Sequence, residues 1–204
     1  MTLARLAVFF VFFLSGFAAL VYQVVWQRSL FAIYGINLES VTVIVTAFML
    51  GLGLGSLAGG ALSKEPRRPV LLLFAAVEAS IGAFGLVSLP LFHRVGEATL
   101  SLPPLATAGV TFLLVLAPTL LMGSTLPLLT AHLVRRSGNV GKSVGALYFV
   151  NTLGSALASV AAVALLLPRL GQARAVLVAA VVNWVAAAIV GGFAVVERKG
   201  AREA

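Results

Sequence analysis

The stretch that decides the fold is SVTVIVTAFMLGLGLGSLAGGAL, at 40–62. It contains no charged side chain, and a helix of this length crosses the hydrocarbon core of a bilayer, which is roughly 30 Å thick. Because lipid offers no hydrogen-bond partner to free backbone groups, a helix is the expected form of such a segment. We therefore predict a transmembrane helix at 40–62.

The whole chain has the same apolar character. Its 204 residues are 61% hydrophobic and only 10% charged, and its mean hydropathy is +1.10. In a soluble domain about a quarter of the residues are usually charged. The composition therefore predicts an all-α, multi-pass membrane protein whose exterior faces the lipid bilayer.

Extending the same reasoning along the chain predicts six transmembrane helices. The first apolar stretch continues past Val25 with no small-residue cleavage site, so we interpret it as a span and not as a signal peptide. Pro118 and Pro127 predict a broken or curved fourth helix. The expected spans are 6–31, 40–62, 69–92, 105–133, 143–167 and 174–196; together they form one domain, 1–196, followed by a charged cytoplasmic tail, 197–204.

The basic residues predict the orientation of these spans. Lysine and arginine are enriched in the cytoplasmic loops of membrane proteins. With both termini in the cytoplasm, the outer side holds Arg28, Arg94, Arg169 and Arg174, and the remainder of the 14 basic residues lie inside. The inner set is Arg5, Lys64, Arg67, Arg68, Arg135, Arg136, Lys142, Arg198, Lys199 and Arg202. We expect a cell membrane of the bacterial inner-membrane type.

Several classes of function are disfavoured by the residues that the chain carries. The net charge is +8, but the basic residues flank apolar spans, which indicates contact with anionic lipid and not with nucleic acid. There is no cysteine, and His93 and His132 are the two histidines, so we expect no metal site. The sequence has no nucleotide-binding loop, catalytic triad or paired carboxylates. We therefore expect no cofactor and no catalytic site made by this chain alone.

A glycine stripe and a short internal echo suggest how the helices are related. Gly51, Gly55 and Gly59 recur every four residues, which favours close helix packing, either as ordinary bundle contact or as a sliding interface in a transporter. Leu-Gly-Ser at 54–56 recurs at 153–155, so the second span corresponds to the fifth. This echo suggests a 3+3 inverted repeat, as in transporter halves.

Polar side chains inside the spans are the candidate ligand-binding residues. Glu78 is the acidic residue well inside a span, and it could bind a cation, carry a proton or pair with a basic group. Asn151, Ser124 and Thr125 fall at a similar depth, and Asn183 lies nearer the midplane. These residues could line one polar pocket open to the cytoplasm. The alternative is that they only hold the bundle together through hydrogen bonds.

The end of the first span carries a second group of candidates. Tyr22, Gln23 and Trp26 lie near one side of the helix, and Arg28 lies near the outer interface. One interpretation is an aromatic belt with an arginine that reaches the headgroups. The other is an outer vestibule in which Arg28 pairs with Glu39.

Four stretches, in this order and at this spacing, carry a family resemblance: FLSGFAALVYQVVWQRSLF (13–31), AFMLGLGLGSLAGGAL (47–62), LLMGSTLPLL (120–129) and GALYFVNTLGSALASVAAVALLLPRLG (145–171). Together they resemble the membrane domain of the membrane-bound spermidine synthase-like proteins. The resemblance implies a domain similar to half of a major facilitator transporter. In that family it accompanies a soluble aminopropyltransferase domain that acts on putrescine.

The resemblance has limits that can be placed on residues. We find no Rossmann-like pattern, glycine loop or acidic set for the soluble domain in this sequence, so the resemblance implies the membrane partner of that chemistry. Gln23 stands where relatives often carry glutamate. The loop LSKEPRRP (62–69) resembles the gating loop of major facilitator proteins, with Arg67 and Arg68 but no aspartate.

Two functions follow as hypotheses. The first is a half-transporter-like protein that binds or moves a small cationic solute such as a polyamine, and that needs a homodimer or a second membrane subunit to complete a path. The second is a membrane anchor or scaffold for a separate aminopropyltransferase, which docks on the inner basic loops near Arg67 and Arg135.

Overall fold

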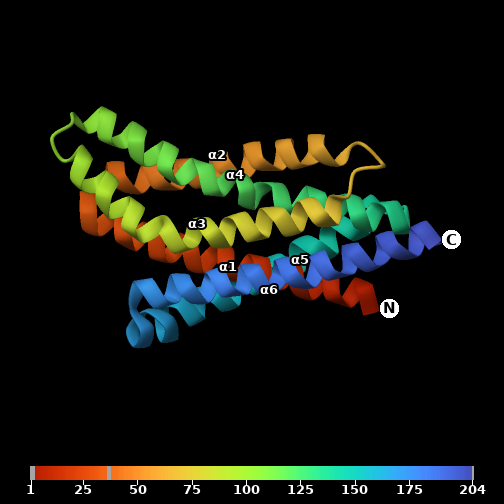
Figure 1. Cartoon of the computed structure of the whole chain (residues 1–204). Coiled ribbons are helices and arrows are strands. Elements are labelled where there is room, and N and C mark those ends of the chain that lie inside the picture. Colours follow the sequence, from red (N-terminus) through yellow and green to blue (C-terminus); the bar gives the residue numbers. More distant parts are fainter. Residues whose placement is uncertain (1–2, 36–37, 204) are drawn as a thin grey trace.

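The computed structural model describes the backbone of residues 3–35 and 38–203 and the side chains of 5–35 and 40–196. Over this part the chain is helical, with no β-strand. The elements are α1 (Leu3–Tyr34), α2 (Leu38–Ser63), α3 (Val70–Thr99), α4 (Pro104–Ser137), α5 (Val140–Ala161), a π-helix η1 (Ala162–Leu166) and α6 (Leu167–Glu203). They lie roughly along one direction as a bundle (Figure 1).

Five helical segments of the described chain are long and apolar enough to cross a membrane. They are Arg5–Tyr34, Ser40–Ser63, Val70–Thr99, Pro104–Ser137 and Val140–Val196. The prediction of six separate spans is therefore not reproduced, because the predicted fifth and sixth spans fall in one continuous segment of 57 residues. The predicted loop between them, 168–173, is helical on both sides of a single residue.

That residue is Gly171, where two helices meet at φ 73° and ψ 177°. This conformation is open to glycine but strained for residues with a Cβ atom. The chain reverses its direction here, so that α6 runs back along α3 and α1 (Figure 1). The π-helix η1 precedes the bend and leads into Pro168, whose ring would clash with the carbonyl of Ala164 in a regular α-helix. The wider π turn relieves this clash.

The helices are longer than the spans expected from hydropathy. Helix α3 reaches Thr99, beyond the predicted end at residue 92, and α4 runs to Ser137. Pro118 and Pro127 both lie inside α4, which remains one continuous helix, so the predicted break is absent there. A helix satisfies its own backbone after it leaves the apolar layer, so it ends at a cap, as α4 does at Gly138 (φ 67°).

Helix α1 is the hub of the bundle. It packs against α5, α6 and α3, while α2 packs along α4 and α3 lies between α4 and α6 (Figure 1). Side chains of α1 reach both hydrophobic clusters of the core, with Val21 and Trp26 in one and Val11 and Phe12 in the other. Because large apolar side chains such as Leu57, Leu113 and Tyr148 are mostly exposed, the exterior suits lipid.

Glycine residues set the closest helix contacts. A Cβ atom at Gly55 of α2 would overlap the carbonyl oxygen of Leu120 on α4, and one at Gly123 of α4 would overlap the carbonyl oxygen of Leu52 on α2. The predicted stripe therefore faces α4, and Gly51 and Gly59 lie in the same contact.

A second pair of helices has the same kind of contact. A Cβ atom at Gly154 of α5 would overlap the carbonyl oxygen of Phe13 on α1, and one at Gly16 of α1 would overlap the carbonyl oxygen of Asn151 on α5. In both pairs glycine lets the two backbones touch.

Candidate functional site

A buried carboxylate lies at the junction of three helices. Glu78 of α3 is 0% exposed. Its Oε1 accepts a hydrogen bond of 2.5 Å from the Ser15 hydroxyl of α1, and its Oε2 accepts one of 2.5 Å from the Asn183 side-chain amide of α6. Ser15 and Asn183 are also buried. We call Ser15, Glu78 and Asn183 the carboxylate cluster. The sequence predicted two of its members, and the structure brings them together.

The carboxylate cluster is short of positive charge. Both partners of Glu78 are neutral donors, which stabilise a carboxylate but do not neutralise it, and a buried charge costs several kcal/mol unless it is compensated. Within the described residues, Asn183 Oδ1 is buried and has no hydrogen-bond partner. Glu78 and Asn183 thus present oxygen atoms suited to a proton or a hard cation. No group of three or more His, Cys, Asp or Glu side chains occurs in the described part of the chain.

Asparagine 183 can serve either protonation state of Glu78. With its nitrogen toward Glu78 it donates to the ionised carboxylate. After a half-turn of the amide, Oδ1 would accept a hydrogen bond from the neutral carboxyl group instead. The orientation of an amide is assigned from its hydrogen bonds, so both arrangements fit this position. Asn183 can therefore form a hydrogen bond with either protonation state of Glu78 without movement of a helix.

The other three predicted polar residues make their hydrogen bonds elsewhere. Asn151 donates its amide to the backbone oxygen of Phe12 on α1, at 3.2 Å. Ser124 and Thr125 each donate to a carbonyl of their own helix α4, both at 2.7 Å. Among the described residues these bonds do not join the carboxylate cluster, so the five predicted residues are not united in one hydrogen-bonded group. Asn151 instead fastens α5 to α1.

The aromatic residues of α1 are core residues. Tyr22 and Trp26 are both 0% exposed, and their rings stack with centroids 4.9 Å apart. Trp26 Nε1 donates to Ser88 on α3 at 2.9 Å, and its ring meets Phe84 edge-on at 5.6 Å. A belt residue faces the headgroups and a vestibule residue faces water. Both predicted interpretations are therefore corrected for Tyr22 and Trp26, which pack α1 against α3.

The polar residues nearby point the other way. Gln23 is partly exposed and Arg28 is exposed. Arg28 lines a surface cavity of about 500 Å³ with Gln27 and Phe31. The predicted pairing of Arg28 with Glu39 lies outside the described residues, since the side chain of Glu39 is not among them. The residues near Tyr22 thus divide between an aromatic core and a polar surface.

One member of the carboxylate cluster is missing from the predicted set, and one predicted residue has a structural role. Ser15 was overlooked because a single serine within FFLSGF carries no pattern that distinguishes it from a packing residue. Arg135, predicted as part of a docking surface, has a structural task at the end of α4. Its guanidinium donates to the carbonyl oxygens of Ser63 (2.9 Å), Glu65 (2.8 Å) and Arg68 (3.1 Å) in the α2–α3 loop.

The same loop carries an ion pair of its own. Arg68 Nε lies 3.1 Å from Glu65 Oε2, and both side chains are well exposed. A pair of this kind contributes little on its own. The three carbonyls held by Arg135 are therefore the stronger restraint on the loop, and Arg67 is left exposed beside them.

The chain is similar to a polyamine aminopropyltransferase 1 of Streptomyces coelicolor. The two are 28% identical over 189 residues, which are 92% of this chain and 34% of the relative. The chain thus spans about a third of the length of the curated relative it matches. No family model matches the chain, and no solved structure matches it. This similarity supports the resemblance to spermidine synthase-like proteins that the sequence carries. The apolar helical bundle is thus similar to part of a protein named for polyamine chemistry.

Proposed function

We propose that this chain is a half-transporter-like membrane protein that binds or moves a small cationic solute such as a polyamine. The observation that carries the proposal is the carboxylate cluster, a fully buried Glu78 held by two neutral donors in the centre of a lipid-facing bundle. Intramembrane carboxylates are costly and are typically found where ions or protons pass. The likeness to a polyamine aminopropyltransferase suggests the class of solute.

The arrangement of the bundle supports six crossings. The reversal at Gly171, inside α6, divides the last segment into two stretches, 140–170 and 172–196, each long enough to span. Helix α1 begins and α6 ends at the same end of the bundle (Figure 1). An even number of crossings places the two ends of the chain on the same side of the membrane. Both ends then lie in the cytoplasm, on the side that the basic residues favour.

The glycine contacts support an inverted repeat. Gly55 and Leu52 of α2 meet Leu120 and Gly123 of α4; Gly154 and Asn151 of α5 meet Phe13 and Gly16 of α1. Adding 99 to the α2 numbers gives the α5 numbers, and subtracting 107 from the α4 numbers gives those of α1. The two contacts therefore match residue by residue when helices α1–α3 are exchanged with helices α4–α6. In transporters built from such repeats, sites lie at the repeat interface.

The repeat interface is where the carboxylate cluster lies. It joins α1 and α3 of the first half to α6 of the second. Rocking of one half against the other would separate Glu78 from Asn183 and expose the carboxylate to a cation. A bundle of six helices encloses too little for a complete path, so we further propose a second copy or a second membrane subunit.

Uptake by proteoliposomes tests the transport proposal. The purified chain is reconstituted and the entry of radiolabelled putrescine and spermidine is measured for the wild type, Glu78→Gln and Glu97→Gln. Glu97 is a matched control, because it is an exposed carboxylate at the end of the same helix. We expect uptake to fall at least tenfold in Glu78→Gln and to persist in Glu97→Gln. Equal uptake by both variants would remove Glu78 from the mechanism.

A second function is favoured by the comparison. The relative is itself an aminopropyltransferase, and this chain matches a third of it, so the bundle could anchor a separate enzyme of that kind. The exposed residues Lys64 and Arg67 in the α2–α3 loop are its candidate docking site. We expect the bundle purified from solubilised membranes to carry aminopropyltransferase activity with it, and a Lys64→Glu/Arg67→Glu variant to lose that activity. If the wild-type bundle recovers no such activity, this function is contradicted.

A further inference from the structure

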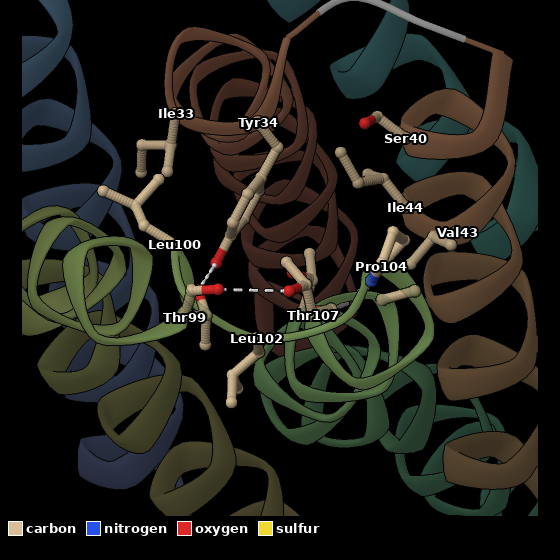
Figure 2. Close-up of a pocket in the computed structure, with 12 residues that line it drawn as sticks. Ile33, Tyr34, Ser40, Val43, Ile44, Thr99, Leu100, Leu102, Pro104 and Thr107 are labelled. Atoms are coloured by element: carbon tan, nitrogen blue, oxygen red, sulfur yellow. Dashed lines mark hydrogen bonds between the residues drawn. The ribbon is translucent and has the colours of Figure 1, made fainter.

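A cavity of about 320 Å³ opens between the end of α1, the start of α2 and the turn that joins α3 to α4. It is separate from the carboxylate cluster and is not lined by any predicted site residue. Apolar side chains such as Ile33, Ile44 and Leu100 form part of its wall, and hydroxyl groups form the rest (Figure 2). None of the described residues that line it is charged.

The protons of the wall hydroxyl groups are committed to the protein. Thr99 Oγ1 donates to the carbonyls of Val95 and Gly96, at 2.8 and 3.0 Å. The Tyr34 hydroxyl, 2.9 Å from Thr99 Oγ1, must therefore be the donor of that pair (Figure 2). A hydroxyl group has one proton and two lone pairs. Tyr34 and Thr99 thus offer the cavity oxygen lone pairs but no proton.

Two further threonines follow the same pattern. Thr107 Oγ1 donates to the backbone oxygen of Thr99 at 3.2 Å, and Thr111 Oγ1 donates to that of Thr107 at 2.9 Å. Ser40, which also lines the cavity, has interactions of its own within the protein. Four hydroxyl oxygens in an apolar wall are therefore hydrogen-bond acceptors.

The backbone beside the cavity adds few donors. Helix α4 begins with Pro104 after Pro103, and proline has no N–H group. After Leu105, the amides of Ala106 and Thr107 donate to Pro103 O at 3.0 and 3.1 Å. Two helices end here and two begin, so their dipoles offset one another. The hydroxyl oxygens of the lining residues then decide what the cavity binds.

We propose that this cavity is a binding site for a small amphipathic molecule that carries hydrogen-bond donors, such as the amino or hydroxyl group of a short alkyl chain. Its apolar walls take the chain, and the oxygens of Tyr34, Thr99, Thr107 and Thr111 accept the donor protons. The Tyr34 ring, which also lines the cavity, offers an ammonium group a favourable π face. Tyr34, Thr99, Thr107 and Thr111 have no proton left for a carboxylate or phosphate of the same size, so we expect such an anion to bind more weakly.

Three probes of one chain length test the proposal: hexane-1,6-diamine, hexane-1,6-diol and hexanedioate. Their binding to the full chain in phosphatidylcholine nanodiscs is measured by calorimetry. We expect the diamine and the diol to bind at least tenfold more tightly than the dicarboxylate. Equal binding of the dicarboxylate overturns the proposal. Phosphatidylethanolamine, added to the nanodiscs, separates two sources of the amine: competition assigns the site to a lipid headgroup, and no competition assigns it to a free solute.

Variants place the binding in this cavity. Thr111→Val removes one acceptor while keeping the shape of the side chain, and Ala108→Leu fills the cavity without removing a hydroxyl group. We expect both to weaken diamine binding at least fivefold. Thr152→Val is the matched control, since Thr152 is exposed on α5. Unchanged binding in both cavity variants, with the folded state shown by circular dichroism, also overturns the proposal.

Discussion

The contribution of Glu78 to stability can be separated into charge and contact by two substitutions. Glu78→Gln keeps the shape of the side chain and removes its charge. The hydrogen bond from Ser15 survives, and a half-turn of the Asn183 amide turns the unpartnered Oδ1 toward the new donor. The amide nitrogen of Asn183 then takes the unpartnered place of its oxygen, so the number of unpartnered amide atoms at Asn183 is unchanged, while the cost of burying a charge disappears. We therefore expect the glutamine variant to unfold at a free energy equal to or above that of the wild type.

Glu78→Ala removes the charge and both contacts. Hydrogen bonds in membrane bundles contribute about 0.6 kcal/mol on average and about 1.7 kcal/mol at most, so two of them amount to about 1–3 kcal/mol. The vacated volume adds about 1 kcal/mol for lost packing. The alanine variant is therefore expected to be less stable than the glutamine variant by about 2–4 kcal/mol.

Reversible unfolding of the full chain in mixed micelles, followed by circular dichroism, measures both differences. The same two substitutions at Glu97, which is exposed, serve as the control and should change stability by less than about 0.5 kcal/mol. Equal stabilities of the glutamine and alanine variants would refute the contact part of the reasoning. A glutamine variant less stable than the wild type by more than about 2 kcal/mol would refute the charge part, because an uncompensated charge cannot stabilise the fold.

Gly55→Ala should destabilise the bundle by about 1–3 kcal/mol, because its Cβ overlaps Leu120 O. Gly53→Ala on the open face should instead stabilise it by up to about 1 kcal/mol. Thermal unfolding of both variants checks the contrast. Gly171→Ala should cost about 1–3 kcal/mol in the same assay, and no cost would contradict the strained bend. Arg135→Ala should free the α2–α3 loop, at a cost of up to about 2 kcal/mol. Hydrogen exchange at 64–68 should then rise several-fold, while Arg67→Ala leaves it unchanged.

Hydropathy predicted where the long apolar helices lie, because the apolar character that suits lipid extends over every residue of such a helix. It could not predict the backbone conformation between the last two spans. Arg169 and Arg174 suggested a polar loop around 168–173, but the chain turns at Gly171 alone, and the flanking residues stay helical. The charge pattern marks residues near the interface and does not show how the backbone turns there.

The candidate site was half predictable. Glu78 and Asn183 stand out because a polar side chain inside an apolar span is energetically unfavourable, and a single residue in the sequence is enough to reveal it. Ser15 does not stand out, since a serine can donate its hydrogen bond to a carbonyl of its own helix, as Ser124 does. Tyr22 and Trp26 were misplaced for a related reason. An aromatic residue near the end of a span fits a belt or a core equally well, and the neighbouring helix decides which.

The central place of α1 has a consequence for how the protein is made. Its hydrogen-bond partners on α3 and α5 come 63 and 139 residues later in the chain. Asn183 follows Glu78 by a further 105 residues. During synthesis, α2 and α4 can pair while α1 still waits in the bilayer for α5 and α6. Until α6 is inserted, one oxygen of Glu78 has no donor, so a truncated chain keeps a half-satisfied acid in the lipid core. That acid distinguishes an unfinished bundle from a finished one.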